Sequence, residues 1–85
     1  MAQLKITFVD GKVVQGEVTP IIEYLFEQHY NMGFHKAFAE EQRQTQVYFL
    51  SHEICKRLGE PVDARLETFI STLKSVEVLD SDPLS

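Results

Sequence analysis

Alternating apolar and polar residues mark the first part of the chain, from Leu4 to Val18, around the dipeptide Asp10-Gly11. Such alternation is typical of half-buried strands, and Asp-Gly between two alternating runs predicts a β-hairpin. A two-residue loop would mix polar and apolar side chains on each face. We therefore expect a three-residue loop, Asp10-Gly11-Lys12, which sets Lys5 opposite Glu17. The apolar face would contain Leu4, Ile6, Phe8, Val14, Gly16 and Val18.

Helical spacing of apolar residues predicts four helices after the hairpin, or three if the short second helix continues into the third. The expected ranges are about 20–30, 34–39, 42–58 and 64–74. Thr19 and Asp63 are residue types whose side-chain oxygens cap helix N-termini, and Pro20 suits a first helical position. Asn31 tolerates the left-handed conformation that ends many helices. The first helix is expected to bury Ile22, Leu25, Phe26, His29 and Tyr30, and the last Leu66, Phe69, Ile70 and Leu73.

Alternation returns near the C-terminus, at residues 76–78. This segment either adds an edge strand to the hairpin or stays extended for a partner. Residues 80–85 are expected to form a flexible tail. The predicted fold class is α+β: one small domain over residues 1–79, in which the hairpin at 4–18, with or without the C-terminal strand, packs on three to four helices.

Length and composition favour a small domain that associates with something else. The chain has 85 residues, 44% hydrophobic and 25% charged. A domain of this size buries only about 60–65% of the surface that its unfolded chain exposes, so a partner or a second copy is expected to add stability. The formal charge of −5 disfavours nucleic acid as that partner.

Cysteine usage and hydropathy bear on the compartment. Cys55 is the only cysteine, which excludes an intramolecular disulfide and favours a reducing compartment. The N-terminus lacks the pattern of a signal peptide, and no run reaches the ~18 apolar residues of a membrane span. We expect neither export by that route nor a place in a membrane.

Catalytic or metal chemistry would have to be built around His52. The pair His52-Glu53 resembles the start of a zinc-protease helix, but Lys56 occupies the position of the second histidine. Ser51 and His52 point about 100° apart on a helix, so they do not form a nucleophile and base. His52 and Cys55 supply too few ligands for a tetrahedral metal site. We expect no catalytic residue, no metal site and no cofactor.

Four large apolar residues, Val47 to Leu50, point in all directions around the predicted central helix. Two interpretations are open: a helix packed on two sides, or a helix with a face for a partner or a second copy. The second interpretation selects the side chains that are hardest to place in one core. These candidate partner-binding residues are Tyr48, Phe49, His52, Val76 and Val78.

Three stretches resemble the short tail assembly chaperones of long-tailed, siphovirus-type phages that infect actinobacteria. They are TPIIEYLFEQHYNMGFHKAF at 19–38, EQRQTQVYFLSHEICKRLG at 41–59 and FISTLKSVEVLDSDPL at 69–84. The resemblance lies in an aromatic-acidic first helix, a Gly-Phe-His segment, a Gln-rich start to an aromatic central helix, and a closing Leu-Lys-Ser-Val-Glu-Val.

The resemblance implies a non-enzymatic protein of the infected host's cytoplasm that holds the tape-measure protein while tail-tube subunits assemble around it. Further partners implied by the family are the tail-tube protein and a longer, frameshifted form of the same chain. Such chaperones are absent from the finished particle. The alternative function is a structural tail or connector component, in which the same apolar surface would form a permanent interface.

Overall fold

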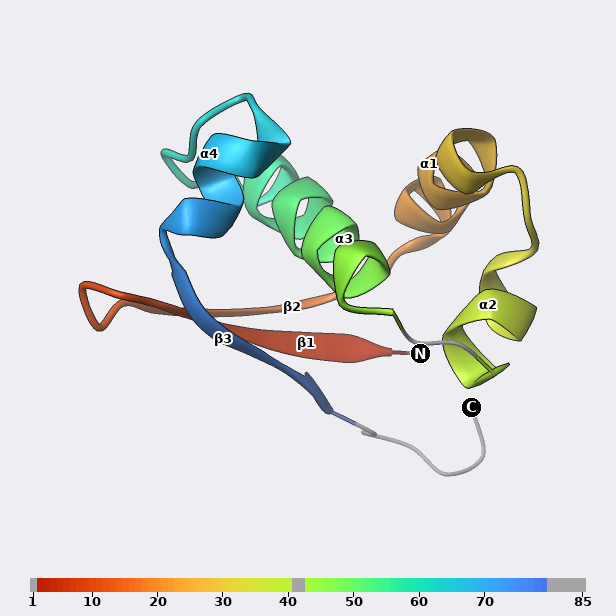
Figure 1. Cartoon of the computed structure of the whole chain (residues 1–85), viewed down its shortest axis with the longest axis horizontal. Coiled ribbons are helices and arrows are strands. Elements are labelled where there is room, and N and C mark those ends of the chain that lie inside the picture. The colour runs from red at the N-terminus through yellow and green to blue at the C-terminus, as the bar shows by residue number, and fades with distance from the viewer. Residues whose placement is uncertain (1, 41–42, 80–85) are drawn as a thin grey trace.

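The computed structural model describes residues 2–40 and 43–79, which form a three-stranded sheet and four helices (Figure 1). The predicted α+β fold class is therefore confirmed. The predicted tail, 80–85, lies outside the described residues. In chain order the elements are β1 (Gln3–Phe8), β2 (Val13–Glu17), α1 (Pro20–Tyr30), α2 (Phe34–Glu40), α3 (Gln44–Arg57), α4 (Leu66–Ser71) and β3 (Leu73–Leu79).

The hairpin forms, but its loop lies one residue earlier than predicted. Phe8 N–H donates to the carbonyl of Lys12, so the loop is Val9-Asp10-Gly11. Gly11, with φ of 95°, takes the third loop position, where a three-residue hairpin needs a left-handed residue. The pairing of Lys5 with Glu17 is wrong: Lys5 pairs with Gln15. The pairing of β2 with β1 is shifted by two residues from the prediction. Because side chains alternate between the two faces of a strand, the same residues still form the apolar face.

The C-terminal segment is a strand, which decides between the two alternatives left open by the sequence. β3 pairs antiparallel with β1, and the order in the sheet is β2-β1-β3. Ile6 faces Val76 and Leu4 faces Val78, so the two valines share the face of fully buried residues. A register shift between Thr7 and Phe8 places a bulge at the start of β3.

The first helix begins and ends at the predicted residues, but its N-terminal cap differs from the prediction. Thr19 has the extended backbone of a cap residue and makes no side-chain cap bond; its carbonyl accepts the N–H of Glu23. The predicted hydroxyl cap is therefore wrong. Pro20 is the first helical residue, and Asn31 ends the helix at φ of 55°. α2 follows directly and packs against α1 through Phe26 and Phe34.

The last helix is much shorter than the predicted range 64–74. Asp63 does not occupy the cap position; its carboxylate accepts the N–H of Arg65, which is the cap residue. The helix ends before Thr72, whose hydroxyl and backbone N–H both donate to the carbonyl of Phe69. Leu73 then begins β3, because the β-branched residues that follow pair with β1 and not with another helical turn.

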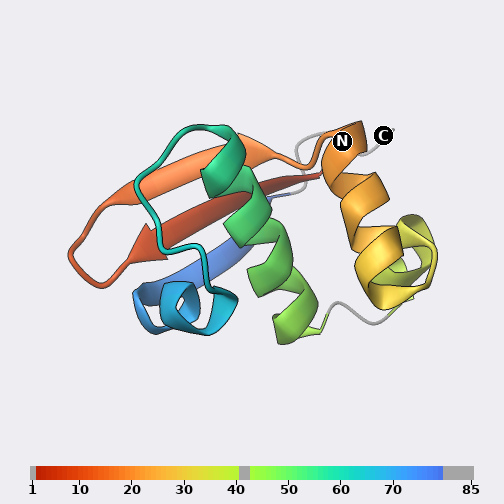
Figure 2. The same cartoon turned by 90° about the horizontal axis from the view of Figure 1, so that it is seen from above.

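α3 and α4 lie over one face of the sheet, with α3 crossing it, whereas α1 and α2 lie beyond one end of the strands (Figure 2). The close approach of α3 to β2 depends on Gly16, since a Cβ at this position would lie 2.6 Å from Cγ2 of Ile54. The opposite face of the sheet carries exposed polar residues, including Lys5, Gln15 and Glu77. One core therefore lies between the sheet and the helices. Its fully buried apolar members include Leu4, Ile6, Val18, Phe26, Leu50 and Cys55.

Candidate partner-binding surfaces

Tyr48 and Phe49 are consecutive on α3, and the structure turns them toward different neighbours. Phe49 is half-buried and stacks on His29 of α1, with ring centroids 4.6 Å apart. It also makes edge contacts with Phe26 and Tyr30. Phe49 therefore belongs to the α1–α3 interface, and His29, predicted to be buried, remains exposed at the outer side of that stack.

Tyr48 points about 100° away from Phe49 around α3. It is one helical turn from His52, so the two side chains share a face. The ring of His52 stacks on Phe69 of α4, with centroids 4.7 Å apart. Tyr48 is half-buried. It therefore lies near α4 and does not form a common surface with Phe49.

His52 is an interior residue, although it is among the side chains that the sequence makes hardest to place in one core. Its side chain is only 4% exposed. The Nε2 atom lies 2.7 Å from the carbonyl oxygen of Asp63 and donates to it, because a carbonyl only accepts. This bond ties the segment after α3 to the middle of α3. His52 therefore has a structural role and offers almost no surface to a partner.

Val76 and Val78, the two β3 residues among the candidates, are both half-buried. Their side chains face the helices, since they pair with Ile6 and Leu4 of the core. Of the five predicted residues, Tyr48, Val76 and Val78 thus lie on the α4 and β3 side of the molecule. Phe49 lies on the α1 side, and His52 lies inside.

Sequence reasoning missed the most exposed aromatic side chain of the helices, Tyr24. Ile21 is 44% exposed and Tyr24 57% exposed. They are three residues apart on α1 and share a face, which we call the α1 patch. The signal was present in the sequence as apolar residues outside the predicted buried stripe of α1. Of the other exposed large apolar residues, Val9 and Val13 lie in or beside the hairpin loop, at the opposite end of the molecule from α1 (Figure 1).

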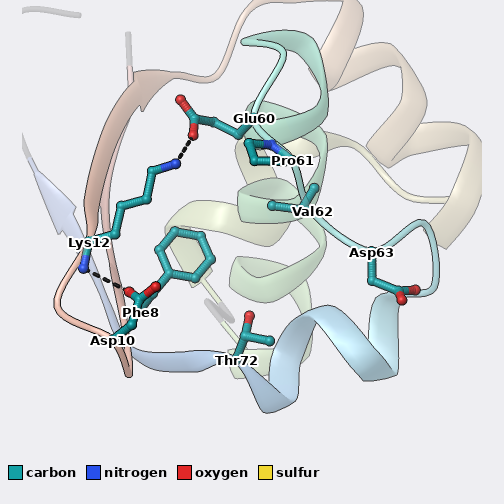
Figure 3. Close-up of a pocket in the computed structure, with 8 residues that line it drawn as sticks. All are labelled: Phe8, Asp10, Lys12, Glu60, Pro61, Val62, Asp63 and Thr72. Atoms are coloured by element: carbon teal, nitrogen blue, oxygen red, sulfur yellow. Dashed lines mark hydrogen bonds and ion pairs between the residues drawn. The ribbon is translucent and has the colours of Figure 1, made fainter.

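A cavity of about 240 Å³ lies between the hairpin loop and the segment that joins α3 to α4 (Figure 3). Lys12 reaches across it and forms an ion pair with Glu60, and this contact raises the pKa of the Lys12 amine. Asp10 accepts the N–H of Lys12, and Asp63 that of Arg65. The lining residues are Phe8, Asp10, Lys12, Glu60, Pro61, Val62, Asp63 and Thr72.

The chemistry of this cavity is that of a structural closure. The charged side chains of the lining form ion pairs or hydrogen bonds with one another or with the backbone. The one hydroxyl group of the lining, on Thr72, donates a hydrogen bond to the carbonyl of Phe69. The lining includes neither histidine nor cysteine. The ion pair between Lys12 and Glu60 holds the hairpin loop against the segment that follows α3.

The remaining nucleophiles also serve the fold. Ser51 donates to the carbonyl of Val47 and does not meet His52. Cys55 is fully buried, and burial raises the pKa of its thiol to about 11, so the reactive thiolate is scarce at neutral pH. Within residues 2–40 and 43–79, no three His, Cys, Asp or Glu side chains gather as a metal site would require.

In the same described ranges, no helix combines the length and the apolar character needed to cross a bilayer. Comparison of the chain with protein-family models, with curated proteins and with solved structures found no match of any kind.

Proposed function

We propose that this chain is a non-enzymatic phage tail assembly chaperone that holds the tape-measure protein in the host cytoplasm. The observation that carries the proposal is the resemblance of residues 19–38, 41–59 and 69–84 to that family. The order of the three stretches supports it as much as their composition does. An aromatic first helix, a Gly-Phe-His segment and an aromatic central helix follow one another as in the family.

The α1 patch is the surface that suits a long helical client best. Apolar residues three apart on an exposed helix pack against a second helix, and aromatic side chains commonly anchor such contacts. Ile21 and Tyr24 meet both conditions. α1 lies at one end of the molecule, beyond the sheet (Figure 2), so a client helix could pass along it without meeting the hairpin.

The contacts of the polar residues also favour binding over catalysis. Ser51, His52 and Cys55 are the residue types that a nucleophilic or metal site would use on α3, and all three are buried. Ser51 and His52 are bonded to backbone carbonyls, and the pKa of Cys55 is raised. Their burial supports a fold that presents apolar surface and not a reactive cleft.

Co-expression of the tagged chain with the tape-measure protein of the same genome tests the proposal. We expect the chain to capture this protein, and the double variant Ile21→Asp with Tyr24→Asp to capture at least about tenfold less, since burying one unpaired charge costs more than 1.4 kcal/mol. Val9→Asp is the matched control. Like the double variant, it places a charge at an exposed apolar residue, but at the far end of the molecule from α1.

Either of two results would count against the proposal. If neither wild type nor Val9→Asp captures the tape-measure protein, the chaperone function is wrong. If the chain is instead found as a stoichiometric component of purified particles, the structural tail or connector function replaces it. Capture that survives the double substitution would keep the function and remove the α1 patch as its surface.

A further inference from the structure

The outer edge of β3 has no hydrogen-bonding partner among the described residues. β3 pairs only with β1, and it is the longest strand of the sheet, at seven residues. In an antiparallel sheet alternate residues of an edge strand direct both N–H and C=O away from the neighbour. The edge of β3 therefore presents a row of free backbone donors and acceptors to any chain that can lie beside it.

Little in β3 blocks such pairing. Proteins usually protect an edge with proline, a bulge, a short strand or a charged residue. β3 contains no proline, its bulge and Lys74 lie at its first residues, and its one other charged residue, Glu77, points to the exposed face of the sheet. From Ser75 to Leu79 the pairing with β1 is regular. This stretch is long enough to hold an added strand.

The helical layer extends past this edge. Figure 2 looks down through the helices onto the sheet and shows α4 and the N-terminal end of α3 beyond β3. α3 touches both β2 and β3, and Ile54 sits over Gly16 of β2. From Ile54 to Gln44 the helix rises about 15 Å, whereas β2 and β3 are about 10 Å apart. α3 therefore extends up to about 5 Å past β3, a distance equal to the spacing between neighbouring strands, so it can cover one added strand.

The side chains at this edge are suited to an added strand. Val76 and Val78 face the helices and are only half-buried, so part of their apolar surface is uncovered. Tyr48, also half-buried, lies in the N-terminal half of α3, one helical turn from His52, whose ring stacks on Phe69 of α4. A strand beside β3 would thus lie under the helices with Tyr48 above it. Glu77 is exposed on the opposite face of the sheet.

A second copy of the chain fits this edge poorly. A two-fold axis normal to the sheet makes the two β3 strands antiparallel and puts both helical layers on one side, where both extensions would occupy the same space. A two-fold axis along the strands makes them parallel, but it brings each N–H opposite the same N–H and each C=O opposite the same C=O, so no ladder of hydrogen bonds forms. The occupant is therefore a strand without a helical layer of its own.

We propose that the free edge of β3 binds an extended segment of another protein as a fourth strand of the sheet. The segment carries apolar side chains at alternate positions, which lie beside Val76 and Val78 beneath the helices. Polar or basic side chains stand between them, on the face of Glu77. Main-chain hydrogen bonds supply affinity in this mode, and the alternate side chains supply specificity. The proposal rests on the sheet and the helices alone and does not depend on the tape-measure protein as client.

A fusion to the full chain tests this proposal without knowledge of the natural partner. The segment Thr-Val-Lys-Val-Thr-Val-Lys is attached after Ser85 through a Gly-Ser linker, which keeps it at an effective concentration in the millimolar range. The control fusion has proline in place of the central valine, since proline cannot pair in a ladder. Amide hydrogen exchange across Ser75–Leu79 is the readout, together with the urea midpoint.

We expect exchange of the outward amides of β3 to slow at least about tenfold in the valine fusion and to stay unchanged in the proline fusion. Equal exchange in the two fusions would overturn the proposal. Concentration-dependent dimerisation of the unmodified chain, with the same β3 amides protected, would also overturn it, because the occupant would then be a second copy. In the valine fusion, Tyr48→Ala should make part of the β3 amides exchange faster again. If these amides stay fully protected in this variant, Tyr48 does not contact the added strand.

Discussion

Gly16→Ala tests whether the close contact between β2 and α3 holds the fold together. The added Cβ would lie 2.6 Å from Cγ2 of Ile54 and 3.4 Å from Cδ1 of Leu58. Ile54 is 2% exposed, and its Cγ2 sits on a stiff β-branched carbon, so this methyl group moves only with the helix or with an unfavourable rotamer. The substitution therefore overpacks the interface.

The expected magnitude follows from two opposing effects. Overpacking a filled core costs about 1–3 kcal/mol in the free energy of unfolding. Replacing glycine inside a strand returns about 0.5–1 kcal/mol of backbone entropy. The net loss is about 1–2 kcal/mol. Because 1 kcal/mol moves the thermal midpoint of a domain of this size by about 4–8 °C, we expect a drop of roughly 5–15 °C.

Thermal and urea unfolding measure this loss, with Gly33→Ala as the matched control. A Cβ at Gly33 meets nothing within 4 Å, so its replacement should cost less than about 1 kcal/mol. On an Ile54→Ala background, which lacks Cγ2, the added cost of Gly16→Ala should fall by at least about 1 kcal/mol. A Gly16→Ala protein as stable as the Gly33→Ala protein would refute the packing argument.

Two further predictions concern a helix end and a buried thiol. Asn31 ends α1 at φ of 55°, so Asn31→Ala should cost about 1 kcal/mol while Asn31→Gly stays within about 0.5 kcal/mol of wild type, as measured by urea unfolding. The pKa of Cys55 is about 11 in the folded chain, above its unfolded value, so the folded state keeps a proton that the unfolded state has lost. Stability should therefore be constant below pH ~9 and fall as the pH rises toward 11, and Cys55→Ala should fall less. A Cys55→Ala protein with the same pH profile as wild type would contradict the second prediction.

Local patterns predicted most of the secondary structure because local chemistry decides it. The apolar face of the hairpin, the start of α1 at Pro20 and its end at Asn31 all follow from residue types at fixed spacing. The predicted loop, Asp10-Gly11-Lys12, has the wrong register because it places Lys12 in the third loop position, where a left-handed residue is needed. In the structure Gly11 takes this position.

Long-range contacts explain the parts that the sequence could not predict. The stripe of α4 continues to Leu73 by spacing, but pairing with β1 ends the helix at Ser71. His52 looked surplus to one core because its two partners, Asp63 and Phe69, come from later segments. The five candidate residues do not form one surface for the same reason. Phe49 packs on α1, and His52, one turn from Tyr48, packs on α4. The sequence of α3 alone does not predict either contact.

Native mass spectrometry of the chain co-purified with the tape-measure protein of its own genome is the most direct test of the proposed chaperone function. We predict complexes in which several copies of the chain bind one tape-measure protein, and their loss in the Ile21→Asp, Tyr24→Asp variant. Spectra that show only the separate proteins, at concentrations where both remain folded, would contradict the proposed function.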